Sequence, residues 1–235
     1  MNELIPGYFI DNAQVTHDLG GASSTLFPPS GHSLAQDVEQ ISHEIDACAG
    51  RGVVLFGHSK GGAAVLLTVL THPDLLFSGK VDAVIVVQGA VGGSPLADVL
   101  SSVARKSPGL RSLRTDQAER AFVEAVDAAV INLSDAELER LFSRIFYLRS
   151  AHQTGAVAAE LAATELAMRG QGENDGLVPS ARMKLDWGVD LGVLDADHAS
   201  LTVSSFLSTS TPDERRALTR ALYREVGRHL GWATR

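Results

Sequence analysis

The stretch that most constrains the fold is GHSKGG at 57–62, which directly follows the apolar run GVVLF at 52–56. A short apolar run bounded by glycines indicates a buried strand. The next eight residues, AAVLLTVL at 63–70, are apolar on nearly every side and end just before His72-Pro73-Asp74, which predicts a buried helix. Ser59 is therefore expected in the turn between a strand and a helix.

The rest of the chain alternates between strand and helix patterns. Short apolar runs predict further strands, and periodic stretches that start at capping boxes predict helices. The expected strands are 52–57, 81–88, 145–148 and 191–194, and the expected helices are 33–49, 61–71, 153–168 and one that begins at Thr211. Two more helical patterns make 96–143 a helical insertion, and we expect a single α/β domain over residues 1–235 with a mostly parallel sheet.

Composition excludes several classes of protein. The chain has 20 basic and 28 acidic residues and a formal charge of −8, which argues against nucleic acid as the main partner. No apolar run approaches the ~20 residues of a membrane span, and the first ten residues carry no signal-peptide pattern, so a cytoplasmic location is expected and secretion stays open. The single cysteine, Cys48, excludes an internal disulfide and lies on an apolar stripe, which predicts a small buried side chain.

Ser59 has the surroundings that a nucleophilic serine needs. In a Gly-X-Ser-X-Gly turn between strand and helix the serine backbone is strained, and the flanking Gly57 and Gly61 are expected to let neighbouring segments approach closely. The N-terminus of the following helix offers main-chain N–H groups to an oxyanion, and the first of them belongs to Lys60.

A serine hydroxyl also needs a base and an acid that orients the base. His198 and Asp175 lie in two loops after the later strands, 23 residues apart. Of the other seven histidines, His43, His72 and His229 are better explained as surface or packing residues. His58 adjoins the serine, and its side chain is expected to point away from it. Asp195 stays open as an alternative acid, and Asp197 adjoins His198 too closely to reach its ring.

The three motifs GHSKGG, NDGLVP and DADHASL, in this order, resemble the signatures of α/β-hydrolase-fold serine esterases, and the last two are similar to those of bacterial triacylglycerol lipases. The resemblance implies Ser59 as nucleophile, Asp175 as acid, His198 as base and Lys60 as an oxyanion-hole donor. The helical insertion at 96–143 predicts either a lid over an apolar acyl site or a cap that only covers the sheet. The calcium-binding aspartate of such lipases is replaced here by Ser200, and we expect neither a metal nor a cofactor.

The N-terminal region departs from this family's pattern, because only 58 residues precede Ser59. One assignment makes 13–19 (AQVTHDL) a strand and 2–10 the start of the first helix. Another takes His17-Asp18-Leu19-Gly20-Gly21 as a degenerate oxyanion loop and leaves the next strand missing. Either way the second oxyanion donor is not identified.

The sequence thus predicts a serine hydrolase that cleaves carboxylic esters through an acyl-enzyme, with a small-molecule acyl ester as substrate and a role in lipid degradation. The alternative is a weak or inactive hydrolase-fold protein that binds a small apolar ligand or a protein partner. A sheet edge left open by the short N-terminal region would allow a homo-oligomer.

Overall fold

The computed structural model describes residues 8–50, 52–103, 107–152, 161, 164, 168, 170–203 and 209–232. Its strands are β1 (Val53–His58), β2 (Val81–Val87), β3 (Ile145–Ser150) and β4 (Val189–Leu194). Its helices are α1 (Ile10–Asp18), α2 (Leu34–Ala47), α3 (Lys60–Thr71), α4 (Asp74–Phe77), α5 (Pro95–Val103), α6 (Pro108–Ser112), α7 (Thr115–Asn132), α8 (Asp135–Phe142) and α10 (Pro212–Leu230), with a 3-10 turn at Ser180–Arg182. None of the described helices is both long and apolar enough to cross a membrane.

The four strands form one parallel sheet in the order β1-β2-β3-β4. The four predicted strands are confirmed, and each observed end lies within two residues of the predicted end. Because all strands run in one direction, their carboxyl ends share one edge of the sheet, and the loops that follow them meet there.

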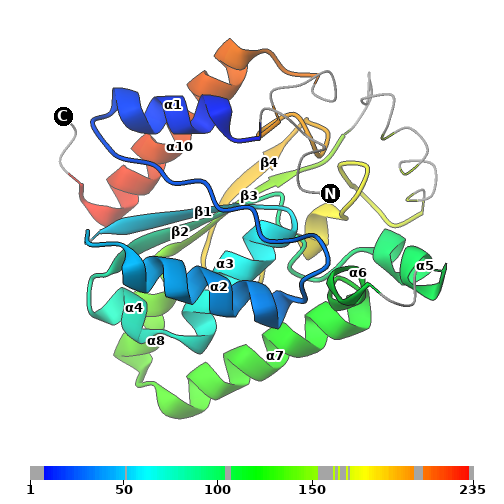
Figure 1. The fold of residues 1–235 in the computed structure, drawn as a ribbon, viewed down its shortest axis with the longest axis horizontal. Coiled ribbons are helices and arrows are strands. Elements are labelled where there is room, and N and C mark those ends of the chain that lie inside the picture. The colour runs from blue at the N-terminus through cyan, green and yellow to red at the C-terminus, as the bar shows by residue number, and fades with distance from the viewer. Residues whose placement is uncertain are drawn as a thin grey trace.

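Helices cover both faces of the sheet (Figure 1). Helices α2, α3, α7 and α8 contribute to a large apolar cluster on one face, and α10 contributes Leu222 and Val226 to a second cluster on the other. Helix α1 packs against α10. Side chains of β2 alternate between the two clusters and are almost all buried, as expected of an inner parallel strand.

Three helices begin as the sequence predicts. Ser33, Ser134 and Thr211 each cap a helix through a complete capping box, and α10 has Pro212 in its first turn. These caps satisfy main-chain N–H groups that have no partner within the helix. Helix α10 then ends at Gly231, whose φ of 67° suits a left-handed C-cap.

The segment between β2 and β3 is helical, in agreement with the pattern at 96–143, and consists of α5 to α8. Helix α7 packs on α3, and its Phe122, Ala125 and Ala129 belong to the large apolar cluster, so it forms part of the core layer. Whether this insertion acts as a lid over the site or only as a cap on the sheet stays a prediction. The helix predicted at 153–168 lies largely outside the described residues.

The prediction of a strand at 13–19 is wrong, because these residues belong mainly to helix α1. The buried residues Asp11, Asn12 and Val15 share one face at helical spacing, and two of them bond to α10: Asp11 accepts from Arg215 Nε at 2.7 Å, and Asn12 donates to Thr219 Oγ1 at 2.8 Å. These hydrogen bonds to α10 stabilise residues 10–18 as a helix.

The rival assignment of 17–21 as a loop that follows a strand is also wrong. His17 and Asp18 form the last turn of α1, and the chain then turns at Gly20 with φ 80°. Within residues 8–50 no strand is present, so β1 is an edge of the described sheet. Residues 2–7 lie outside the described part.

The expectation that Cys48 is buried is wrong as well, because its side chain is exposed. Helix α2 ends at Ala47, and Cys48 has extended backbone with φ −67° and ψ 118°. The apolar stripe of the helix therefore ends at Ile45, and Cys48 no longer follows the helical period.

Candidate active site

Ser59 occupies a sharp turn between β1 and α3. Its backbone has φ 55° and ψ −125°, a combination that non-glycine residues rarely adopt. The turn is held by main-chain hydrogen bonds, since Ser59 N–H donates to Val87 O at 3.2 Å and Ser59 O accepts from Ala90 N–H at 3.0 Å. The strain persists because the end of β2 and the loop after it bond to the N–H and the C=O of Ser59.

The glycines around Ser59 serve different purposes. A Cβ on Gly57 would lie 2.5 Å from Gly61 O and from Val65 Cγ2, so only glycine fits there. A Cβ on Gly62 would lie 3.0 Å from Gly89 Cα, whereas one on Gly61 would meet no atom of the described residues within 4 Å. The expected close approach is therefore present at Gly57, absent at Gly61, and present instead at Gly62.

Three side chains from distant loops meet at this turn. Ser59 Oγ lies 2.8 Å from His198 Nε2, and His198 Nδ1 lies 2.7 Å from Asp175 Oδ2. The partners are 139 and 23 residues apart in the chain. A proton on Nδ1 donates to the carboxylate and leaves Nε2 as the acceptor of the serine hydroxyl.

Asp175 is completely buried, yet its carboxylate is well supplied with donors. Oδ1 accepts from the main-chain N–H groups of Leu177 at 3.1 Å and Val178 at 2.9 Å, and Oδ2 accepts from Ser150 Oγ at 3.0 Å. Burial alone would raise the pKa of Asp175, but the charge and hydrogen bond of His198 and the N–H groups of Val178 and Leu177 hold it below its ordinary value. The carboxylate is thus ionised beside the imidazole.

The other two acidic candidates do not contact the His198 ring in the described part. Asp195 has a side chain that is 62% exposed and lies 3.7 Å from His152 Nδ1. Asp197 is buried and accepts from Ala199 N–H at 3.0 Å and from the hydroxyls of Ser200 and Thr209. Its role is to shape the loop that carries His198.

Lys60 follows Ser59 and is the first residue of α3. Its Nζ donates to the buried carboxylate of Asp37 at 2.7 Å and to His32 O at 2.5 Å, so the side chain is tied to the start of α2. Burial raises the pKa of Asp37, and Lys60 partly offsets this. The side chain of Lys60 therefore holds this residue in place, and its main-chain N–H lies at the N-terminus of α3.

Two residues at this edge of the sheet were not identified from the sequence as part of the site. His58 is buried, and its Nε2 lies 2.9 Å from His198 O and 3.1 Å from Gln88 Oε1. Gln88, at the end of β2, is also buried and has φ 49°. The only sequence signal is that each polar residue ends a strongly apolar strand.

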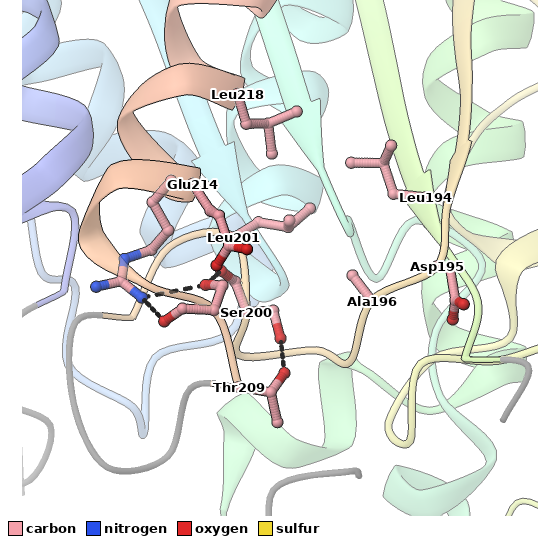
Figure 2. Close-up of a pocket in the computed structure, with 10 residues that line it drawn as sticks. Leu194, Asp195, Ala196, Ser200, Leu201, Thr209, Glu214 and Leu218 are labelled. Carbon is pink, nitrogen blue, oxygen red and sulfur yellow. Dashed lines mark hydrogen bonds between the residues drawn. The ribbon is translucent and has the colours of Figure 1, made fainter. Parts of the chain in front are cut away.

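A cavity of about 370 Å³ lies next to the His198 loop but is separate from Ser59. It lies between the end of β4 and the start of α10 (Figure 2). Leu194 and Ala196 line one side, and Leu201 and Leu218 line another. Neither Ser59 nor His198 lines this cavity, so the Ser59 hydroxyl does not face it. Within the described residues no cluster of three or more His, Cys, Asp or Glu could hold a metal ion.

Comparison with known proteins identifies the family of the fold. A family model described as "Alpha/beta hydrolase family" matches residues 8–215, which is most of the chain. No curated protein is similar enough in sequence to count as a match.

Several solved structures share the fold. The metagenomic carboxyl esterase MGS0156 superposes with a TM-score of 0.74 and 25% identity, over 94% of this chain and 70% of that one. The mature lipase BlEst2 of Bacillus licheniformis gives a TM-score of 0.70 and 21% identity, over 92% and 83% of the two chains. The phospholipase PlaB of Legionella pneumophila gives 0.59 and 12%, over 95% and 60%.

Proposed function

The chain belongs to the alpha/beta hydrolase family, and from this premise we propose that it is a serine hydrolase that cleaves carboxylic esters. The observation that carries the proposal is the continuous contact from Ser59 through His198 to Asp175, on loops that follow parallel strands. The carboxyl esterase MGS0156 and the lipase BlEst2, which share the fold, support an ester as substrate.

In the proposed reaction Ser59 Oγ attacks the acyl carbonyl carbon while His198 Nε2 takes the hydroxyl proton. The tetrahedral intermediate collapses, and the alcohol leaves with the proton from His198, so that the acyl group remains on Ser59. Water then repeats the sequence, with His198 as base, and releases the carboxylic acid. Asp175 stabilises the imidazolium in both halves without taking its proton.

The oxyanion of each intermediate needs donors that are already in place. We assign one of them to the main-chain N–H of Lys60, at the N-terminal end of α3. The Lys60 side chain, tied to Asp37, holds this first helical turn against α2. The second donor is left unassigned, since no loop that follows a strand precedes β1 within residues 8–50.

Turnover of p-nitrophenyl esters of different acyl length tests the proposal. The wild type is expected to hydrolyse at least one of them, and Ser59→Ala is expected to lower kcat by a factor on the order of 10⁶. Asp195→Asn is the matched control, because this exposed carboxylate lies outside the Ser59–His198–Asp175 contact. A folded wild type with no turnover, or a Ser59→Ala variant as active as the wild type, would favour a ligand-binding function instead.

A further inference from the structure

A second group of polar side chains, three of them buried and Tyr8 half-buried, lies next to Asp175 and His198. It consists of Tyr8, His58, Gln88 and Ser150, and none of the four contacts Ser59 Oγ in the described structure. Each comes from a different part of the fold: the N-terminal segment and the carboxyl ends of β1, β2 and β3. Polar groups removed from water need hydrogen-bond partners, so the partners of these four side chains show which parts of the site they connect.

Gln88 is the centre of the group. Its Nε2 donates to Ser150 Oγ at 2.6 Å and to Asp197 O at 2.8 Å, and its Oε1 lies 3.1 Å from His58 Nε2. Asp175 Oδ2 is also 3.4 Å from Nε2. One amide thus contacts the loop of Asp175, the peptide before His198 and the residue before Ser59.

The hydrogen bonds of the group have a single consistent direction. The Tyr8 hydroxyl donates to His58 Nδ1, which places the His58 proton on Nε2, where His198 O and Gln88 Oε1 both accept. Gln88 then donates to Ser150 Oγ, which leaves the Ser150 proton to donate to Asp175 Oδ2 at 3.0 Å. The series ends on the carboxylate that accepts from His198 Nδ1–H.

His58 must be neutral for this series to form, since a protonated ring has no acceptor for Tyr8. Burial, followed by the nearby charge of His198, lowers the pKa of His58 to about 3. The ring is therefore neutral across the range in which a serine hydrolase works. The neutral form of His58 that the hydrogen bonds require is thus also the form that burial favours.

We propose that Gln88 is a positioning residue, which aligns the Asp175 carboxylate through Ser150 and the His198 main chain through Asp197 O. The inference rests on the proposed function, because alignment matters only if His198 moves a proton. Gln88 is 0% exposed, so it does not touch substrate, and its effect belongs to kcat. A small displacement of reacting groups costs about 10- to 100-fold in rate, which sets the size of the expected effect.

The test compares Gln88→Met, Ser150→Ala and the double variant. Gln88→Met keeps the length of the side chain but removes the amide, and we expect kcat on a p-nitrophenyl ester to fall by about 10- to 100-fold with KM within twofold. The acid limb of the kcat/KM profile should move to higher pH, because a carboxylate with fewer donors holds the imidazolium more strongly. The double variant should lose about as much as the larger single loss, since both residues act through Asp175.

Thr68→Val is the matched control. Thr68 is also completely buried and donates only within its own helix, to Ala64 O at 2.8 Å, so its loss should leave kcat and the pH profile unchanged. Gln88→Met with kcat within threefold of wild type and an unmoved profile would overturn the proposal. If Gln88→Met does not fold, Ser150→Ala tests the same link, with the same expected and contradicting results.

A second readout separates this inference from the proposed function. The Nδ1 proton between His198 and Asp175 gives an NMR signal that does not depend on turnover, and it should shift or broaden in Gln88→Met but not in Thr68→Val. An inactive wild type would reject the proposed function while this signal still reports the alignment. An active, Ser59-dependent wild type with an unchanged signal in Gln88→Met would reject the inference alone.

Discussion

Strands β1 and β2 are neighbours, and each is followed by a non-glycine residue with positive φ, Ser59 at 55° and Gln88 at 49°. Ser59 directs its hydroxyl to His198, whereas Gln88 is buried and bonds to the main chain and side chains behind the site. A positive φ thus occurs at a reactive residue after one strand and, as we propose, at a positioning residue after the next. Strain at a strand end does not by itself mark a nucleophile.

Asp175 receives hydrogen bonds from both regions, and its replacement should lower kcat more than replacement of Gln88. In Asp175→Asn the amide can no longer accept from both His198 and Ser150 in the same geometry, which disfavours the imidazole tautomer with Nε2 free. We expect kcat on an ester substrate to fall by about 10⁴. Steady-state kinetics checks this, with Asp195→Asn expected within twofold of wild type.

A loss as small as tenfold in Asp175→Asn would contradict the role of Asp175 as the acid that aligns His198. It would mean that Ser59 and His198 react without an aligned acid, and that the group behind Asp175 has a structural role only.

The two glycines of the Gly-X-Ser-X-Gly pattern should differ in effect on stability. Gly57→Ala places a methyl group against main-chain atoms, so we expect the free energy of unfolding to fall by about 2 kcal/mol or more. Gly61→Ala meets open space in a helix and should raise stability by up to about 1 kcal/mol. Denaturant unfolding of both variants measures the difference, and equal effects would show that the turn is packed differently.

His58 links the two strand ends and should make stability depend on pH. The unfolded state binds a proton on His58 below about pH 6.5, while the folded state, with a pKa of about 3, does not, so stability falls as pH falls through this window. The slope is about 1.4 kcal/mol per pH unit. Between pH 6 and pH 4 the wild type should lose about 2 to 3 kcal/mol more than His58→Gln.

Chemical unfolding at several pH values measures this difference between wild type and His58→Gln. The carboxylates titrate in both proteins, so their contribution cancels in the comparison. Parallel pH dependences would show that His58 titrates alike in the folded and unfolded states and is not buried in its neutral form.

What the sequence predicts well is local. The strand before Ser59, the helix after it and the three capping boxes each depend on residues within a few positions of one another, and all are confirmed. The pairing of Asp175 with His198 is what the resemblance to serine esterases implies, whereas a position after a strand of the parallel sheet leaves Asp195 open as well.

What the sequence does not predict depends on distant partners. Gln88 bonds to residues 30, 62 and 109 positions away, so its role is visible only after the sheet has formed. Helix α1 likewise depends on contacts of Asp11 and Asn12 with α10, more than 200 residues later. The period of residues 13–19 alone did not distinguish that helix from a strand.

The central claim is that Ser59 is a nucleophile activated by His198, and covalent labelling tests it most directly. A fluorophosphonate probe should add to the wild type at one site, which peptide mass spectrometry should locate at Ser59. The adduct should be absent in Ser59→Ala and form much more slowly in His198→Ala. A folded wild type that takes up no probe, or a Ser59→Ala variant that is still labelled at the wild-type rate, would contradict the account.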